Sequence, residues 1–264
     1  MGVAVPFNDL SRIQAKLQQE IIQTTTRVIS SGSFILGPEV EKFEIELAKY
    51  LGCTDAVGVA TGTDAILLSL LAADVGTNDV VLTMANAGSY TTIATRAIGA
   101  EPVFVDVAAD SLQMTLRNLK KSLEATKAIG LKPKAVVVTH LFGQLNSEIM
   151  EIAEFANSEG LILIEDCAQS IGASNGSRLA GSFGALSTFS FFPTKNLGAL
   201  GDAGAVSGKD SGLLSKIRQL RQYGWGAKYS IEIPLGRNSR LDEIQAAILR
   251  LKLPIVSDWN KKRR

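Results

Sequence analysis

The sequence predicts an α/β protein in three layers, with a mostly parallel central sheet and helices on both of its faces. Short apolar runs, of which 161–164 is the clearest, alternate along the 264-residue chain with longer segments whose apolar residues recur at helical spacing. Such uninterrupted runs are typical of strands that are buried on both faces. Their regular alternation with helical segments favours parallel strands joined by helices.

The individual elements follow from local signals. Pro38 can begin a helix and Gly52 can end it, and small residues at 61–63 lie between a strand and the next helix. Unpaired backbone N–H groups at 61–63 suit a phosphate, although on the residues alone a plain glycine turn with a threonine cap is the commoner interpretation. Strands are expected at 56–60, 79–84, 101–106, 134–139 and 161–164, in a segment that begins at 187, and in the later part of 198–207 after its glycine-rich start. Helices are expected at 9–30, 39–50, 64–73, 90–98, 116–129, 148–158, 212–222 and 241–253, and a loop at 223–229.

Two strand ends carry reactive side chains. Glu165 and Asp166 directly follow the apolar run 161–164, and Lys195 follows an aromatic strand that begins at Ser187. In open α/β sheets, ligands bind at the carboxyl ends of the strands. Pyridoxal phosphate needs an amine that holds it covalently and a carboxylate that keeps its ring nitrogen protonated. The sequence therefore predicts that Lys195 and Asp166 are the catalytic pair of a pyridoxal-phosphate enzyme.

Composition argues against several kinds of partner. Lys plus Arg number 27 and Asp plus Glu number 26, so a net charge of +1 gives no general attraction to nucleic acid or to a membrane surface. No apolar run approaches the length of a membrane span, and the first six residues lack the features of a signal peptide. We expect a cytoplasmic protein.

A metal site is not expected. The chain has one histidine, His140, and two cysteines, Cys53 and Cys167, that form no CxxC motif. A histidine at a strand end is more often structural than catalytic, and the cysteines are most simply read as reduced thiols.

Four segments resemble the DegT/DnrJ/EryC1/StrS sugar aminotransferases, a family of fold-type-I pyridoxal-phosphate enzymes. They are GTDA at 62–65, EDCAQS at 165–170, FSFFPTKNLG at 189–198 and GRNSRL at 236–241, and they occur in the family's order and spacing. The chain departs from the family's acid-Gly-Gly pattern at Ala203. Lys195 separates it from a branch of the family that performs dehydration and has histidine at that position.

The resemblance implies a role for each candidate site residue. Lys195 would hold the cofactor and move a proton as general base and acid, and Asp166 would pair with the ring nitrogen. Tyr90 would stack on the ring and Gln169 would contact its phenolic oxygen; on the residues alone, a buried core tyrosine is the commoner interpretation. Within the same subunit, the phosphate would be held by Gly62, Thr63, Asp64 and Ser190, and the partner subunit would add Asn238. On the residues alone, Asn238 could also simply cap the helix that follows it.

The resemblance also implies an activity and a domain plan. The reaction would be transamination of a nucleoside-diphosphate keto-sugar, with L-glutamate as amino donor, by a homodimer that makes amino sugars for lipopolysaccharide, cell-surface glycans or antibiotics. The expected parts are an N-terminal helix and active-site arm at 1–37, a large cofactor-binding domain at 38–240, and a helix at 241–264. That helix would lead to a small C-terminal domain that is absent from this chain.

Two alternatives stay open from the sequence. One is a truncated large domain that binds pyridoxal phosphate but turns over little or not at all. The other is a nucleotide-binding Rossmann-like protein, which would explain the alternating elements, although neither glycine cluster, 58–62 or 198–204, has GxGxxG spacing. A GxSxG match at 172–176 lacks a later histidine and is taken as accidental.

Overall fold

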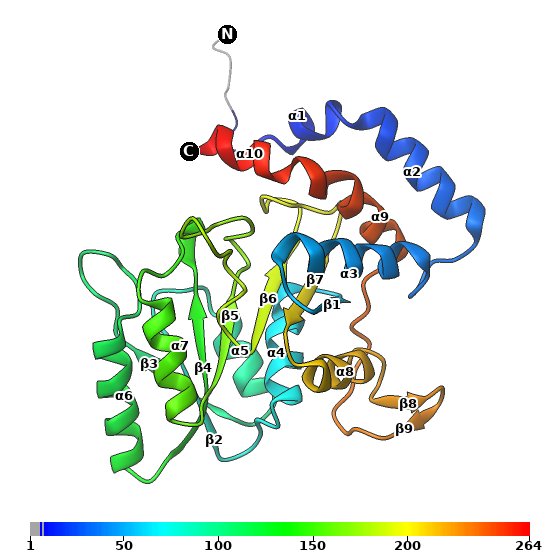
Figure 1. Cartoon of the computed structure of the whole chain (residues 1–264). Coiled ribbons are helices and arrows are strands. Elements are labelled where there is room, and N and C mark those ends of the chain that lie inside the picture. The colour runs from blue at the N-terminus through cyan, green and yellow to red at the C-terminus, as the bar shows by residue number, and fades with distance from the viewer. Residues whose placement is uncertain (1–5, 7) are drawn as a thin grey trace.

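A seven-stranded sheet forms the centre of the molecule in a computed structural model that describes residue 6 and residues 8–264 (Figure 1). The strand order is β1-β7-β6-β5-β4-β2-β3. The strands are β1 (Asp55–Val59), β2 (Asp79–Met84), β3 (Glu101–Val105), β4 (Lys132–Thr139), β5 (Ile162–Asp166), β6 (Leu186–Ser190) and β7 (Gly204–Gly208). The predicted mixed α/β class with a mostly parallel sheet is confirmed.

Strand β7 is the one strand of this sheet that runs opposite to its neighbours. It pairs antiparallel with both β6 and β1, whereas β2 to β6 pair in parallel. The segment between β6 and β7 contains no helix, so the chain turns back instead of crossing over the sheet. This return segment carries Lys195 past the carboxyl end of β6.

Helices cover both faces of the sheet, and alternate residues of each strand point to opposite faces. In β4, for example, Val137 packs with one cluster that includes helix α4, while Val136 and Val138 pack with another that includes α6 and α7. Burial on both faces explains why the strands read as continuous apolar runs. The helices are α1 (Leu10–Ala15), α2 (Gln18–Ser31), α3 (Pro38–Leu51), α4 (Gly62–Ala72), α5 (Tyr90–Ala97), α6 (Leu116–Ala128), α7 (Ile149–Ser158), α8 (Ser211–Leu220), α9 (Glu243–Lys252) and α10 (Val256–Arg263), with 3₁₀ turns at Leu141–Gly143 and Leu253–Ile255.

The terminal helices differ in detail from the prediction. The helix expected at 9–30 is divided into α1 and α2, and the C-terminal helix is interrupted after Lys252 by a 3₁₀ turn that contains Pro254, which has no N–H for a regular helical bond. A small hairpin of β8 (Trp225–Ala227) and β9 (Ser230–Ile231) replaces the loop expected at 223–229. Residues 1–5 and 7 of the expected N-terminal arm, and with them the segment judged to lack a signal peptide, lie outside the described residues.

Helices α9 and α10 lie beside α1, α2 and α3 at one end of the molecule (Figure 1). The α9 residue Glu243 is buried, and its carboxylate accepts the backbone N–H groups of Gly37, Glu39 and Val40 at 2.8–2.9 Å. A side chain from the C-terminal part of the chain therefore caps the N-terminus of α3. Within the described residues, no helix is both long and apolar enough to cross a membrane.

Candidate active site

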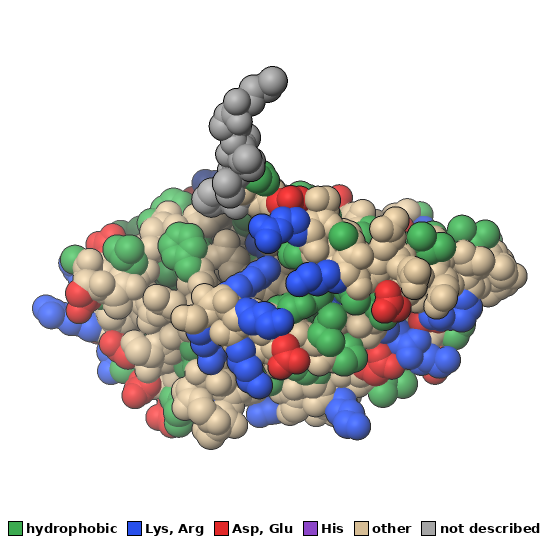
Figure 2. Space-filling view, turned by 90° about the horizontal axis from the view of Figure 1, so that it is seen from above, with side chains coloured by type: hydrophobic (Ala, Val, Ile, Leu, Met, Phe, Trp, Pro, Cys, Tyr) green, Lys and Arg blue, Asp and Glu red, His purple; other side chains and the backbone are tan. Residues whose placement is uncertain are grey.

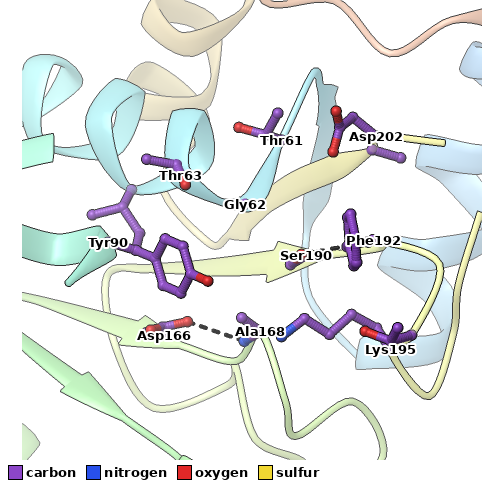
Figure 3. A pocket seen from close by; sticks show the side chains of 13 residues that line it. Thr61, Gly62, Thr63, Tyr90, Asp166, Ala168, Ser190, Phe192, Lys195 and Asp202 are labelled. Atoms are coloured by element: carbon purple, nitrogen blue, oxygen red, sulfur yellow. Dashed lines mark hydrogen bonds between the residues drawn. The ribbon is translucent and has the colours of Figure 1, made fainter. Parts of the chain in front are cut away.

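A cavity of about 400 Å³ lies at the carboxyl ends of β5 and β6 (Figure 3). It is bounded by the N-terminus of α4 on one side and by the segment that follows β6 on the other. Six predicted site residues line it: Gly62, Thr63, Tyr90, Asp166, Ser190 and Lys195. These residues come from four separate parts of the chain, and only the parallel sheet brings them together.

Asp166 and its neighbour Glu165 are both buried, yet they have different surroundings. Glu165 accepts backbone N–H groups of Gly181, Phe183 and Gly184 at 2.6–2.9 Å, and its Oε2 lies 2.8 Å from His140 Nε2. These donors hold the pKa of Glu165 below its usual value despite burial. Its oxygens are fully used inside the protein.

Asp166 has fewer donors and faces the cavity. It accepts the Ala168 N–H at 3.0 Å and the Thr139 hydroxyl at 3.2 Å. Burial raises the pKa of Asp166 above its ordinary value, because two donors do not compensate for the loss of water. A cationic N–H group in the cavity would complete the hydrogen bonding of this carboxylate.

Lys195 reaches into the same cavity from the segment after β6. Figure 3 shows its side chain extending across the cavity toward the strand end that carries Asp166. Burial lowers the pKa of Lys195, and the charge of Asp166 partly opposes that shift. A lowered pKa leaves a larger share of the amine unprotonated and able to act as a nucleophile or base.

The N-terminus of α4 forms an anion cradle on the opposite wall. Thr61 caps the helix by accepting the Asp64 N–H at 3.0 Å, which leaves the first N–H groups, at Gly62 and Thr63, directed outward at the positive end of the helix. A Cβ at Gly62 would lie 2.6 Å from Cβ of Ser190, so only glycine lets this helix approach the β6 serine. The cradle therefore fits a phosphate held by backbone N–H groups and by the hydroxyl of Ser190.

Tyr90 supplies an aromatic ring at the mouth of the cavity. It is the first residue of α5, is 55% exposed, and its ring covers Gly88, where a Cβ would lie 2.7 Å from the ring. Figure 3 shows Tyr90, Asp166 and Lys195 around the same cavity. The cavity as a whole fits a flat ligand with an anionic group at α4 and a cationic nitrogen at Asp166. Its residues thus fit a phosphorylated pyridine ring.

Three predicted site residues do not line the cavity. Asp64 accepts the Ser239 hydroxyl at 2.8 Å, and Gln169 accepts the Phe142 N–H at 2.8 Å. The side-chain Oδ1 of Asn238 accepts a hydrogen bond from Nε of Arg240, on its own segment. The sequence predicts that Asn238 acts in the site of the partner subunit. A single chain does not test that role, which stays a prediction.

The cavity also contains residues that were not singled out from the sequence. Ala168, Phe192 and Thr194 each lie within three residues of Asp166 or Lys195, and this proximity was the available signal. Ala203, the departure from the family pattern, is buried and also lines the cavity, and it is not among the residues with positive φ. Its methyl group therefore causes no backbone strain.

His140, Glu165 and Cys167 form a buried group whose ligand atoms lie within 4.8 Å of one another. His140 Nδ1 accepts the Asn146 N–H at 3.1 Å, which directs the Nε2 proton to Glu165. Burial raises the pKa of Cys167 well above its usual value. The imidazole and carboxylate are thus committed to hydrogen bonds, as the structural interpretation of His140 predicts.

The mostly parallel sheet, the aspartate at the end of β5 and the lysine on the segment after β6 together place the protein in the class of α/β proteins of the aminotransferase type. The chain belongs to the DegT/DnrJ/EryC1/StrS aminotransferase family, whose model matches residues 15–264. The family expected from the sequence motifs is therefore confirmed.

Individual relatives agree with this assignment. The chain is 43% identical over 245 residues to dTDP-3-amino-3,4,6-trideoxy-alpha-D-glucose transaminase of Micromonospora megalomicea, covering 93% of this chain and 64% of that protein. A crystal structure of a DegT DnrJ EryC1 StrS aminotransferase from Brucella abortus superposes with a TM-score of 0.92 at 38% identity, over 97% of this chain and 68% of that one. The ntda structure from Bacillus subtilis, which has bound cofactor pmp, gives a TM-score of 0.88 at 31% identity, over 97% and 57% of the two chains. The chain thus spans about two thirds or less of the length of these relatives.

Proposed function

We propose that the protein is a pyridoxal-phosphate-dependent aminotransferase that acts on a keto-sugar linked to a nucleoside diphosphate. The observation that carries this proposal is the single cavity that joins Lys195, Asp166 and the anion cradle of α4. Relatives that are named as transaminases of dTDP-linked and UDP-linked sugars support the choice of substrate class. Amino-sugar biosynthesis is the corresponding process.

Different residues of the cavity would hold different parts of the cofactor. Gly62, Thr63 and Ser190 would bind its phosphate, Tyr90 would cover one face of the ring, and Asp166 would accept a hydrogen bond from the ring nitrogen. The cofactor, when bound, supplies an electron sink for the carbanion formed at the amino donor. Asp166, as a buried carboxylate, would keep a proton on that nitrogen.

Lys195 is the residue that would attach the cofactor and then carry the proton. Because burial lowers its pKa, a larger share of the Nζ amine is unprotonated, and Lys195 would hold the cofactor covalently through this atom. When released, the same Nζ can take a proton from one carbon and return it to another, because it is tethered on the short segment after β6. Asp166, on the neighbouring strand, favours the protonated state of Nζ after the transfer.

The remaining features of the proposal concern donor, assembly and location. L-Glutamate is the proposed amino donor, and a cytoplasmic homodimer is the proposed form, with Asn238 contributed to the partner's phosphate site. Exposed aromatic side chains at the cavity, including Phe192 at 48%, support coverage by a second copy. The segment 241–264 is proposed to connect to a further small domain.

Reconstitution with pyridoxal phosphate tests the proposal. We expect the wild-type protein to bind the cofactor with the near-visible absorbance of a lysine adduct and to aminate a nucleotide keto-sugar in a glutamate-dependent manner. Lys195→Ala should lose both the absorbance and the activity while keeping its circular dichroism spectrum. Absorbance without turnover would favour the alternative of a cofactor-binding large domain, and wild-type protein without the absorbance would disprove the assignment of Lys195.

A further inference from the structure

Helix α9 carries a lysine that is buried without a carboxylate partner. Lys252 is 1% exposed, and its Nζ donates to the carbonyl oxygen of Gly198 at 2.7 Å. Among the described residues, no ion pair involves Lys252. Burial lowers the pKa of Lys252 to about 8. Burying an ammonium group costs free energy, and one carbonyl acceptor compensates for only part of that cost. The burial of Lys252 therefore needs an explanation other than packing.

The acceptor lies three residues after Lys195, in a tightly folded segment. The Lys195 N–H donates to the carbonyl oxygen of Phe192, and the Ala199 N–H donates to that of Phe191, both at 2.8 Å. At Gly198 a Cβ would lie 2.4 Å from the carbonyl oxygen of Pro193, so the segment closes on itself at this glycine. The Gly198 carbonyl therefore cannot shift without moving the turn that carries Lys195.

Two further contacts link the C-terminal helices to the same segment. The α9 residue Gln245 accepts the Leu200 N–H at 2.8 Å, and the α10 residue Asn260 accepts the side-chain amide of Asn196 at 2.7 Å. Together with Lys252, these residues contact the segment at 196, 198 and 200. We call Gln245, Lys252 and Asn260 the C-terminal clamp.

We propose that Lys252 is a positioning residue that, with Gln245 and Asn260, sets the orientation and reactivity of the Lys195 amine through the turn 195–200. The clamp touches neither the cavity nor Lys195 directly, since none of its three members lines the cavity. Replacing Lys252 by an apolar residue would leave the Gly198 carbonyl buried without a donor, and the turn would relax to find one. Small shifts of a reacting group cost rate even when they originate outside the site.

The test compares two cation-to-methionine substitutions on the same helix. Lys252→Met removes the donor to Gly198. Arg250→Met is the matched control, because Arg250 lies on α9 and its ion pairs are with Glu39 and Glu46 of α3, away from the turn. In cofactor-free protein, the labelling rate of Lys195 by an amine-reactive reagent is followed across a pH series by mass spectrometry. This measurement does not require that the proposed transamination takes place.

Lys252→Met is expected to change the Lys195 labelling rate several-fold and to shift its pH midpoint, whereas Arg250→Met leaves both at the wild-type values. Rebuilt with pyridoxal phosphate, Lys252→Met should lower kcat about tenfold with little change in the KM for the sugar nucleotide. Gln245→Ala, a substitution at a partly exposed site, should shift the labelling in the same direction if Lys252→Met fails to fold.

Unchanged Lys195 labelling in both clamp variants would overturn the proposal, as would an equal change in Arg250→Met, which would indicate a loss of stability alone. The positioning role rests on Lys195 being the reactive amine of the proposed function. A protein in which labelling responds to the clamp but no amination is detected would retain the positioning role and refute the proposed function.

Discussion

Two adjacent residues of β5 show how the surroundings of a carboxylate decide its role. Glu165 and Asp166 have the same charge and nearly the same position along the chain. One side chain points away from the cavity into a set of backbone donors, and the next points into the cavity. Alternation along the strand separates a structural acid from the candidate catalytic one.

Amide substitutions at these two positions should have opposite effects on stability. Glu165→Gln places an NH₂ group against backbone donors and should reduce the free energy of unfolding by roughly 2–4 kcal/mol. Asp166→Asn should make the cofactor-free protein more stable at neutral pH, because the raised pKa of Asp166 means that the folded state resists its ionisation. Denaturant unfolding of both variants without cofactor gives the comparison.

The pH dependence of the unfolding free energy tests the direction of the effect of Asp166→Asn. Below pH 3.8, the ordinary pKa of an aspartic acid, the carboxyl group is protonated in the folded and unfolded states alike, and burial of its charge no longer costs stability. As the pH rises past that value toward the folded-state pKa, the unfolded chain loses its proton first and the wild type loses stability relative to Asp166→Asn. If the difference in unfolding free energy between the wild type and Asp166→Asn were the same at all pH values, burial would not be its cause.

With the cofactor bound, Asp166→Asn should abolish amination.

At the scale of elements, one side chain joins the two ends of the chain. Glu243 on α9 satisfies three N–H groups at the start of α3, more than 200 positions earlier, and Gly37 leaves room for it because a Cβ there would lie 2.9 Å from its carboxylate. Helix α9 therefore holds α3 through Glu243 and the Lys195 turn through Lys252.

Loss of this cap should be measurable. Glu243→Gln is expected to lower the free energy of unfolding by roughly 2–3 kcal/mol, because an NH₂ group, which cannot accept a hydrogen bond, replaces one carboxylate oxygen. Hydrogen exchange at residues 37–40 should accelerate. Glu41→Gln, an exposed acid in the first turn of α3, serves as the control and should have little effect. Equal losses in the two variants would show that general charge at the helix end, rather than the cap, stabilises α3.

On the scale of the whole molecule, a single chain leaves the cavity open to solvent, and Tyr90 and Phe192 are exposed at its edge. Figure 2 shows the molecule from above, where lysine and arginine side chains gather among polar and apolar ones. The proposed second copy belongs at the aromatic edge of the cavity.

Mixing two inactive variants tests whether a second copy completes the site. If Lys195 acts in its own subunit and Asn238 in the partner's, a mixed dimer of Lys195→Ala and Asn238→Ala contains one site with neither substitution. Random exchange of equal amounts should then restore about a quarter of the wild-type activity. Neither variant alone should be active, and no recovery after confirmed subunit exchange would place Asn238 in its own subunit or outside the site.

By itself, the sequence determined the fold class, the order of the strands and helices along the chain, and the identity of the site motifs. These are local properties: apolar runs mark strands buried on both faces, and Lys195 and Asp166 follow such runs directly. The motifs also identified the family, because their order and spacing survive along the whole chain.

Only the tertiary structure decided which residues meet. In the structure, β7 runs antiparallel to β6. Glu165 points into the core and Asp166 into the cavity. Asp64 and Gln169 bind a hydroxyl and a backbone N–H and do not line the cavity. The fold also buries Lys252, which looks in the sequence like any exposed lysine of an amphipathic helix. The physical reason is that direction, burial and hydrogen-bond partners arise from contacts between residues far apart in the chain, and no local pattern encodes those contacts.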